Sequence, residues 1–312
     1  MLARKRNQII AMLITAVMVL TLVPPMQLNA MQLFVLDINE SKITLEVENG
    51  DSGTLNSTPV EGSTVNLLGG DALAFAQNYA RGAINKYYTR YDNKYVPAAF
   101  EVTCDKKEYA TLYTLKLDTK PDLSTAKTYT SDTNSFKVLD LFNGTDYYYE
   151  VTTNELNLKY STGIIKVSTA QLPRTLYIDS IGNTRDLGGC YTVDGKYRMK
   201  QGIIYRGANV DKISAVGKQK MLDELKIKTD LDLRGKSTKS PLGTGVKCVS
   251  ISSPSYSNAL HIDYNWEALR KEVMTFADPN NYPIYVHCAI GRDRTGTLCF
   301  LIGALAGMSE KD

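Results

Sequence analysis

The 312-residue chain is nearly balanced in charge, with 36 lysines and arginines against 33 aspartates and glutamates and a formal net charge of +3. The three excess positive charges lie within residues 1–30, so the remainder carries 33 charges of each sign. This balance argues against a nucleic-acid partner or any other partner bound through one strongly charged surface, and the length allows two domains.

Residues 1–30 have the pattern of a secretory signal peptide. A basic cluster at 4–6 precedes a mostly apolar run at 9–23, which prolines at 24 and 25 end. A membrane-spanning helix needs about 20 apolar residues, which this run does not reach. We therefore expect a secreted or cell-surface protein with no stable membrane anchor after cleavage. An uncleaved anchor is the alternative.

Residues 31–94 carry few functional signals, and the sequence leaves their role open. Alternating apolar and polar residues at 42–48 predict a strand. Residues 71–90 predict a helix with Asp71 as its N-cap, because apolar side chains recur there at helical spacing. Such a stripe is typical of a helix that faces a core.

Residues 95–171 change in character towards short strands. Five segments alternate or are rich in β-branched and aromatic residues, at 99–104, 110–117, 136–141, 147–151 and 163–168. Short strands at this regular spacing predict an all-β sandwich. The segment LFNGTDY at 141–147 resembles the tyrosine corner of fibronectin type III modules. That resemblance implies that Tyr147 bonds back to the chain upstream.

Residues 172–312 alternate between strand and helix after a boundary at Pro173. Strands are predicted at 202–207 and 227–234, with a helix at 214–225 between them. This β-α-β order predicts an α/β domain with a central, largely parallel sheet flanked by helices.

A strand, a tight loop and a helix N-terminus follow near the end of the chain. Residues 282–286 predict a buried strand and 297–305 an apolar helix, with HCAIGRDRTG at 287–296 between them. The N–H groups of such a loop and the positive end of the helix dipole favour a phosphate. Gly291 allows close approach of the backbone, and Arg294 can bind two phosphate oxygens.

Cys288, at the start of this loop, is the candidate nucleophile. Helix N-termini and cationic neighbours lower the pKa of a cysteine from about 8.5 to roughly 3.5–7.5, so we expect a thiolate that attacks phosphorus in line. A buried structural cysteine is the alternative. The five cysteines form no CxxC pair typical of a redox or zinc site, and we expect no metal and no cofactor.

The loop resembles the signature of the cysteine-dependent tyrosine and dual-specificity phosphatases, which is His-Cys, five residues, Arg, Thr or Ser, and Gly. The resemblance implies a cysteinyl-phosphate on Cys288, with Arg294 as the phosphate clamp. It also implies that Thr295 steadies the thiolate and that His287 orients the cysteine from behind the loop. The residues expected to surround the phosphate are His287, Ala289, Ile290, Gly291 and Arg292.

Three more segments resemble a bacterial branch of these phosphatases that has lipid-phosphatase members. They are NTRDLGG at 183–189, IIYRG at 203–207 and TDLDLR at 229–234. In this branch a fibronectin-like module often precedes the catalytic domain, and further helices normally follow the position of Asp312. The resemblance therefore implies a C-terminally incomplete phosphatase domain. Arg185 and Asp186 are expected to be structural at the sheet edge, with phosphate contact as the alternative.

The general acid has two candidates. A carboxyl group near the loop is the usual donor of a proton to the leaving oxygen. The chain lacks the Trp-Pro-Asp loop of many tyrosine phosphatases, but in the resembling branch the aspartate before the loop arginine, here Asp293, is the proposed acid. Asp232, at the end of a predicted strand, competes with it. Alternatively, Asp293 only anchors Arg292 or Arg206.

Two substrate classes fit these patterns. One is a phosphotyrosine protein. The other is a phosphoinositide or inositol polyphosphate, because Arg292 adds a second cation to the loop, although lysine is the usual residue there and arginine changes the geometry. An inactive phosphate-binding or adhesion module is the non-enzymatic alternative.

Overall fold

The computed structural model describes residues 34–39, 42–47, 52–68, 73, 76, 97–155, 158–254 and 262–309. The predicted signal peptide lies outside these residues, as does the helix predicted at 71–90 except for Leu73 and Ala76, which are helical. Strands β1 (Phe34–Asn39) and β2 (Lys42–Val47) pair antiparallel, which confirms the strand predicted at 42–48. No described helix is long and apolar enough to cross a membrane.

Two β-sheets share one core between residues 52 and 169. The larger follows the path β3-β11-β10-β12-β5, with β7 between β10 and β8, and the smaller has the order β4-β6-β9. Alternate side chains such as Phe100, Leu115 and Tyr149 are fully buried between the sheets. The strands are β3 (Ser52–Thr54), β4 (Ser57–Thr58), β5 (Thr64–Val65), β6 (Phe100–Cys104), β7 (Tyr113–Asp118), β8 (Lys127–Ser131), β9 (Ser135–Val138), β10 (Asp146–Glu155), β11 (Leu158–Ser161) and β12 (Ile165–Thr169).

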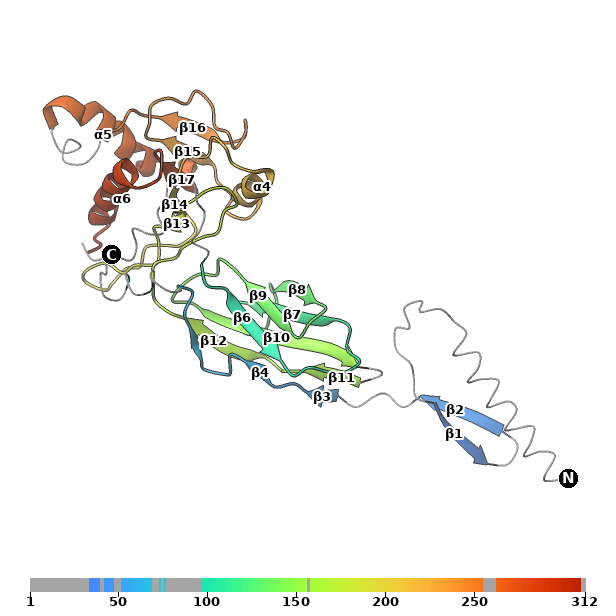
Figure 1. Cartoon of the computed structure of the whole chain (residues 1–312). Coiled ribbons are helices and arrows are strands. Elements are labelled where there is room, and N and C mark those ends of the chain that lie inside the picture. The colour runs from blue at the N-terminus through green and yellow to red at the C-terminus, as the bar shows by residue number, and fades with distance from the viewer. Residues whose placement is uncertain are drawn as a thin grey trace.

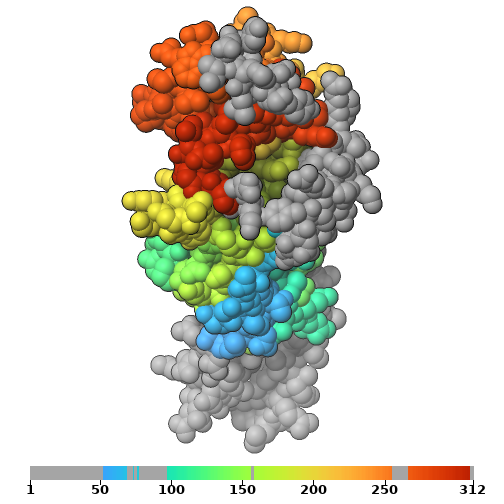
Figure 2. Space-filling view, turned by 90° about the vertical axis from the view of Figure 1, so that its left-hand side faces the viewer, coloured from blue at the N-terminus to red at the C-terminus, as the bar shows by residue number. Residues whose placement is uncertain are grey.

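The five strands predicted from 99 to 168 are present as β6, β7, β9, β10 and β12. Strands β8 and β11 were not predicted, because they are polar and have no buried residue. The short strands β3, β4 and β5 lie upstream of residue 95 and pair with β11, β6 and β12. Figure 2 shows these residues, in blue, against the green strands, so the two sheets extend upstream of the start predicted at 95.

Tyr147 closes the loop that precedes β10. Its hydroxyl accepts a hydrogen bond from the backbone N–H of Phe142 over 2.9 Å, which is the upstream bond predicted for a tyrosine corner. Burial raises the pKa of Tyr147, so this hydroxyl stays protonated. The assignment to fibronectin type III modules stays a prediction.

The described residues after 174 form a five-stranded sheet of order β13-β14-β17-β15-β16. Only the edge strand β13 is antiparallel to its neighbour, so the largely parallel sheet predicted from the sequence is confirmed. The elements are β13 (Arg185–Asp186), β14 (Ile204–Gly207), α4 (Ala215–Asp223), β15 (Thr229–Asp232), β16 (Lys247–Ser250), α5 (Ile262–Ala277), the 3-10 helix η2 (Pro279–Asn281), β17 (Ile284–His287) and α6 (Asp293–Leu305).

Both faces of this sheet are covered. Tyr285 of β17 packs with Met221 of α4 in one core, whereas its neighbours Ile284 and Val286 pack with Leu298 of α6 in the other. Figure 1 shows α4 on one side of the sheet and α5 and α6 on the opposite side. Strand β17 is therefore buried on both faces, as the continuous apolar run at 282–286 predicts.

The sandwich and the α/β domain meet at the loop after β9. Arg174, which is 6% exposed, donates to the carbonyl groups of Asp140 and Leu141 over 2.6 and 3.0 Å. It also forms a 2.7 Å ion pair with Asp186 of β13. The Asp140 carboxylate pairs with Lys220 of α4. One loop of the sandwich is thus bonded to both an edge strand and a helix of the α/β domain.

Candidate active site

Cys288 directly follows the central strand of the α/β sheet. β17 ends at His287, residues 288–292 turn, and α6 begins at Asp293. The helix therefore begins four residues before the predicted position 297. Residues 293–295 are polar, and the apolar periodicity on which the prediction rests starts after them. Four residues of the predicted loop, 293–296, thus form the first turn of α6.

The Cys288 side chain is 3% exposed. Burial alone would raise the pKa of its thiol, but hydrogen bonds from the side chain and backbone of Thr295 and from the backbone N–H groups of Arg292 and Ile290 lower the pKa to about 7. These donors come from both the loop and the first turn of α6. A substantial fraction of the thiol is therefore ionised at neutral pH.

The N-terminus of α6 has no side-chain cap. Its N-cap residue, Arg292, makes no capping hydrogen bond. The buried Thr295 hydroxyl makes no hydrogen bond of standard geometry to a described residue, and it lies close enough to Cys288 to lower the pKa of the thiol. Uncapped N–H groups at a helix start carry partial positive charge, so this end of α6 favours an anion.

Gly291 lies where the loop passes closest to β14. Its φ of 68° is in the left-handed region, and a Cβ added to it would lie 2.1 Å from the carbonyl oxygen of Gly207. Glycine is required here both by the backbone conformation and by the lack of space.

His287 is buried behind the loop. Its Nε2 lies 2.8 Å from a carboxylate oxygen of Asp230, and its Nδ1 lies 3.1 Å from the carbonyl oxygen of Cys288. Both oxygens are acceptors, so a ring protonated on both nitrogens satisfies both contacts. Burial alone would lower the pKa of His287, but the bond and charge of Asp230 raise it. The ring fixes the backbone of Cys288 from below.

Arg294 extends from the first turn of α6 towards the neighbouring strand. Its Nη1 donates to the carbonyl oxygen of Leu233, just after β15, over 3.0 Å. A guanidinium group has five N–H donors, and this is the one hydrogen bond that Arg294 makes to a described residue. The remaining donors are available to a ligand.

The two candidate acids have different surroundings. Asp232 is fully buried; burial alone would raise its pKa, but hydrogen bonds from Arg234 and Ser237 lower it to about 2. Asp293 is about one-third exposed, and its Oδ1 lies 3.9 Å from Nε of Arg292. Of these two carboxyl groups, only that of Asp293 is exposed to solvent.

Three side chains that the sequence did not assign to the site bind the outer side of the loop. The Asn183 amide donates to the carbonyl oxygens of Ile290 and Gly291, each over 3.0 Å. Arg206 donates to the same Gly291 oxygen over 2.9 Å. Asn209 donates to the carbonyl oxygen of Ala289 over 2.7 Å. Two sequence features could have pointed to these residues. Asn183 is the first residue of the segment NTRDLGG, and Asn209 lies just after the end of strand β14.

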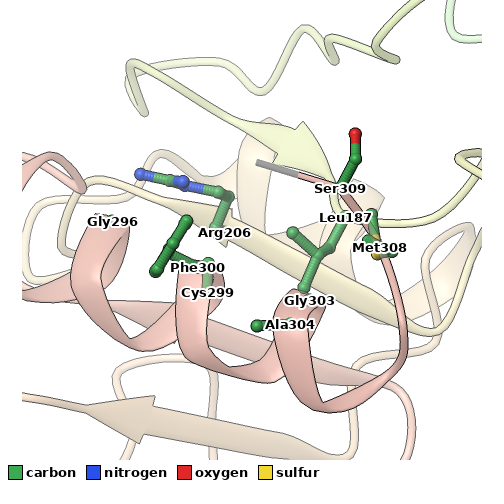
Figure 3. A pocket seen from close by; sticks show the side chains of 9 residues that line it. All are labelled: Leu187, Arg206, Gly296, Cys299, Phe300, Gly303, Ala304, Met308 and Ser309. Atoms are coloured by element: carbon green, nitrogen blue, oxygen red, sulfur yellow. The ribbon is translucent and has the colours of Figure 1, made fainter. Parts of the chain in front are cut away.

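A cavity of about 370 Å³ lies beside α6, away from the sulfur of Cys288. Arg206 and Gly296 line it at one end and Met308 and Ser309 at the other (Figure 3). Because Cys288 does not line it, this cavity is separate from the loop at 288–292.

The described part of the chain contains no disulfide and no cluster of side chains that could bind a metal ion. All five cysteines are free, and no group of three or more His, Cys, Asp or Glu side chains there could hold a metal ion.

Residues 176–312 match the model of the tyrosine phosphatase family, and this range includes the whole loop and its flanking elements. This part of the chain is therefore similar to the tyrosine phosphatase family. The matched range begins just after Arg174 and contains every candidate site residue named above.

A protein of Cupriavidus necator, named as a candidate tyrosine-protein phosphatase, is 26% identical over 164 residues, covering 44% of this chain and 59% of the relative. The chain thus spans 59% of the length of this curated relative. Among solved structures, the core catalytic domain of the PP-IP phosphatase SIW14 from S. cerevisiae is 24% identical and covers 34% of this chain and 63% of that chain. Its TM-score of 0.28 is too low to support an argument.

Proposed function

We propose that this chain is a phosphomonoester hydrolase of the protein-tyrosine phosphatase type, acting through a cysteinyl-phosphate on Cys288. The observation that carries the proposal is the environment of the Cys288 sulfur. Three backbone N–H groups and the Thr295 hydroxyl lower the thiol pKa to about 7 at the uncapped end of α6. The match of residues 176–312 to the tyrosine phosphatase family supports the same activity.

In the first step, the Cys288 thiolate attacks phosphorus, so that an S–P bond forms while the P–O bond to the leaving group breaks. Arg294 and the N–H groups of 289–293 bind the anionic oxygens, and Asp293 gives a proton to the leaving oxygen. In the second step, water attacks phosphorus and gives its proton to Asp293. The S–P bond then breaks, phosphate leaves, and Thr295 stabilises the thiolate that returns.

Asp293 is the better candidate for the acid. A general acid must hold a proton at the working pH. Asp232, with its pKa lowered to about 2 and its oxygens bonded to Arg234 and Ser237, has no proton to give. We expect Asp293→Asn to lower kcat by about 10²–10⁴-fold on a substrate with a poor leaving group, and much less on p-nitrophenyl phosphate. Equal losses on both substrates would rule out this role.

Two observations bear on the substrate. Phosphotyrosine protein is the primary candidate because of the family match. Arg292, whose side chain is 54% exposed beside the loop, favours a second candidate, a phosphoinositide or inositol polyphosphate, because an additional phosphate needs its own cationic partner.

The test is phosphate release by the full chain and by Cys288→Ser, with a chelator present, from a phosphotyrosine peptide, a phosphoserine peptide and a phosphoinositide. Cys299→Ser is the matched control, because Cys299 is also buried in this domain and burial raises the pKa of its thiol. We expect release that survives in Cys299→Ser and disappears in Cys288→Ser, and the ranking of substrates separates the two candidates. Phosphate binding by a folded protein without any release would instead favour an inactive binding module.

We also propose that the sandwich is a fibronectin type III-like module and that the protein is exported. The Tyr147 hydrogen bond to Phe142 supports the first proposal, and the pattern of residues 1–30 supports the second. Sequencing the N-terminus of the protein recovered from outside the producing cell tests export. Recovery only inside the cell with residues 1–30 intact would contradict it.

A further inference from the structure

In two peptide units of the loop, both the C=O group and the N–H group make hydrogen bonds. In a trans peptide the C=O and N–H groups point in opposite directions, so holding the oxygen outward directs the N–H inward. In the unit that joins Ala289 to Ile290, the oxygen accepts from Asn209 over 2.7 Å, and the N–H donates to the Cys288 sulfur.

The unit that joins Gly291 to Arg292 has the same arrangement. Its oxygen accepts from Asn183 over 3.0 Å and from Arg206 over 2.9 Å, while its N–H donates to the Cys288 sulfur. Two of the three backbone N–H groups that lower the pKa of Cys288 therefore belong to peptide units whose oxygens are held by side chains from other elements.

Asn183 is itself held in one orientation. Arg185 donates from Nη2 to the Asn183 side-chain oxygen over 2.7 Å, which fixes that atom as the acceptor and leaves the amide N–H groups to face the carbonyls of Ile290 and Gly291. The backbone of Asn183 has φ of 60°, a conformation that asparagine adopts more readily than most residues.

We propose that Asn183, oriented by Arg185, and Asn209 are positioning residues that set the ionisation of Cys288. They bind the loop carbonyls on the outside and so keep the N–H groups directed at the sulfur and at a bound phosphate. If a carbonyl turned inward, it would present an acceptor to the thiolate instead of a donor. This inference takes the role of Cys288 from the proposed function, but the ionisation of the thiol is measurable without turnover.

The test is a titration of the Cys288 thiol, followed by the ultraviolet absorbance of the thiolate relative to Cys288→Ser in the same background. For the unaltered chain we expect a midpoint near pH 7, the pKa of about 7 given by the structure. Asn183→Ala and Asn209→Ala should each raise the midpoint by about one unit, which means about tenfold less thiolate near pH 6.

Asn183→Gly separates the lost hydrogen bonds from backbone strain. Glycine adopts the φ of 60° at this position without strain, but it has no donor for the two carbonyls, so it should raise the midpoint as much as alanine does. A rise in Asn183→Ala that is absent in Asn183→Gly would come from strain and would contradict the inference.

Asn281→Ala is the matched control. The Asn281 side chain is buried and, like Asn183 and Asn209, donates to a backbone carbonyl, that of Thr275, over 2.7 Å, but it does not touch the loop. Its removal should lower the melting temperature and leave the midpoint unchanged. If Asn183→Ala does not fold, Asn209→Ala carries the same test, because it removes the 2.7 Å side-chain bond to the Ala289 oxygen and leaves only the 3.3 Å bond from the backbone N–H of residue 209.

Midpoints equal to that of the unaltered chain in folded Asn183→Ala and Asn209→Ala would overturn the inference, even if the chain releases phosphate. Raised midpoints in a chain that releases no phosphate would support the inference and contradict the proposed function. The experiment therefore tests the positioning role of Asn183 and Asn209 independently of the proposed phosphatase activity.

Discussion

Replacing Asp186 with asparagine tests the buried ion pair at the junction of the two domains. The Asp186 side chain is fully buried and that of Arg174 is 6% exposed, and their charged atoms lie 2.7 Å apart. Asp186 also accepts hydrogen bonds from the backbone N–H groups of Gly188 and Gly202. Asparagine has one acceptor oxygen, so it leaves at least one of these N–H groups facing an NH₂ group, and it leaves Arg174 as a buried cation without a counter-charge.

Breaking one half of a buried ion pair costs about 3–5 kcal/mol, out of a total free energy of unfolding that is typically about 5–15 kcal/mol. We therefore expect Asp186→Asn to lower the urea midpoint strongly, as measured by circular dichroism. The control is Lys137→Ala, which removes a 2.9 Å ion pair with Glu101 whose side chains are 69% and 57% exposed. Exposed pairs contribute about 0.2–1 kcal/mol. A loss for Asp186→Asn as small as that of the control would refute the reasoning.

Two further predictions concern the loop. Gly291→Ala should abolish phosphate release and destabilise the domain, because the added Cβ would lie 2.1 Å from the Gly207 oxygen. The control is Gly62→Ala, at a φ of 76° with open space around it, which should lower the free energy of unfolding by only about 1 kcal/mol. Equal losses of unfolding free energy in the two variants would mean that the clash at Gly291 is relieved. Activity should fall as pH drops through about 7, since the Cys288 thiolate takes up a proton there, and Thr295→Val should move this acid limb to higher pH because one donor to the sulfur is lost. An unchanged pH profile of kcat/KM in Thr295→Val would show that the hydroxyl does not act on the thiol.

Much of the fold follows from local patterns in the chain. Strand β17 was predicted from its continuous apolar run, and β14, β15 and α4 were predicted at 202–207, 227–234 and 214–225 in the β-α-β order of an α/β domain. The start of α6 was predicted four residues too late. Residues 293–295 are polar, so they gave no apolar pattern, although their backbone is already helical. Strands β3, β4 and β5 have two or three residues each, too few for a periodic signal, and they exist because distant strands supply the hydrogen bonds.

Some residues of the candidate site could likewise be predicted from the sequence, and others could not. Residues 287–296 are contiguous, so the positions of His287, Cys288 and Arg294 relative to one another follow from the sequence. Asn183 lies 107 residues from Ile290 in the chain, and Asn209 lies 80 residues from Ala289. No local pattern reports such contacts, which depend on the sheet order β13-β14-β17 of the folded domain.

The bonds made by the loop after β9 have a consequence for how freely the α/β domain can be recombined with other modules. A domain cut at residue 172 would keep Arg174 and Lys220 but lose the Asp140 and Leu141 groups that they bind. Arg174 would keep its ion pair with Asp186 but lose both carbonyl acceptors, and Lys220 would lose its carboxylate partner. A gene fusion that exchanged the sandwich would have to bring a loop with the same acceptors, because residues 172–312 depend on that loop for some of their polar contacts.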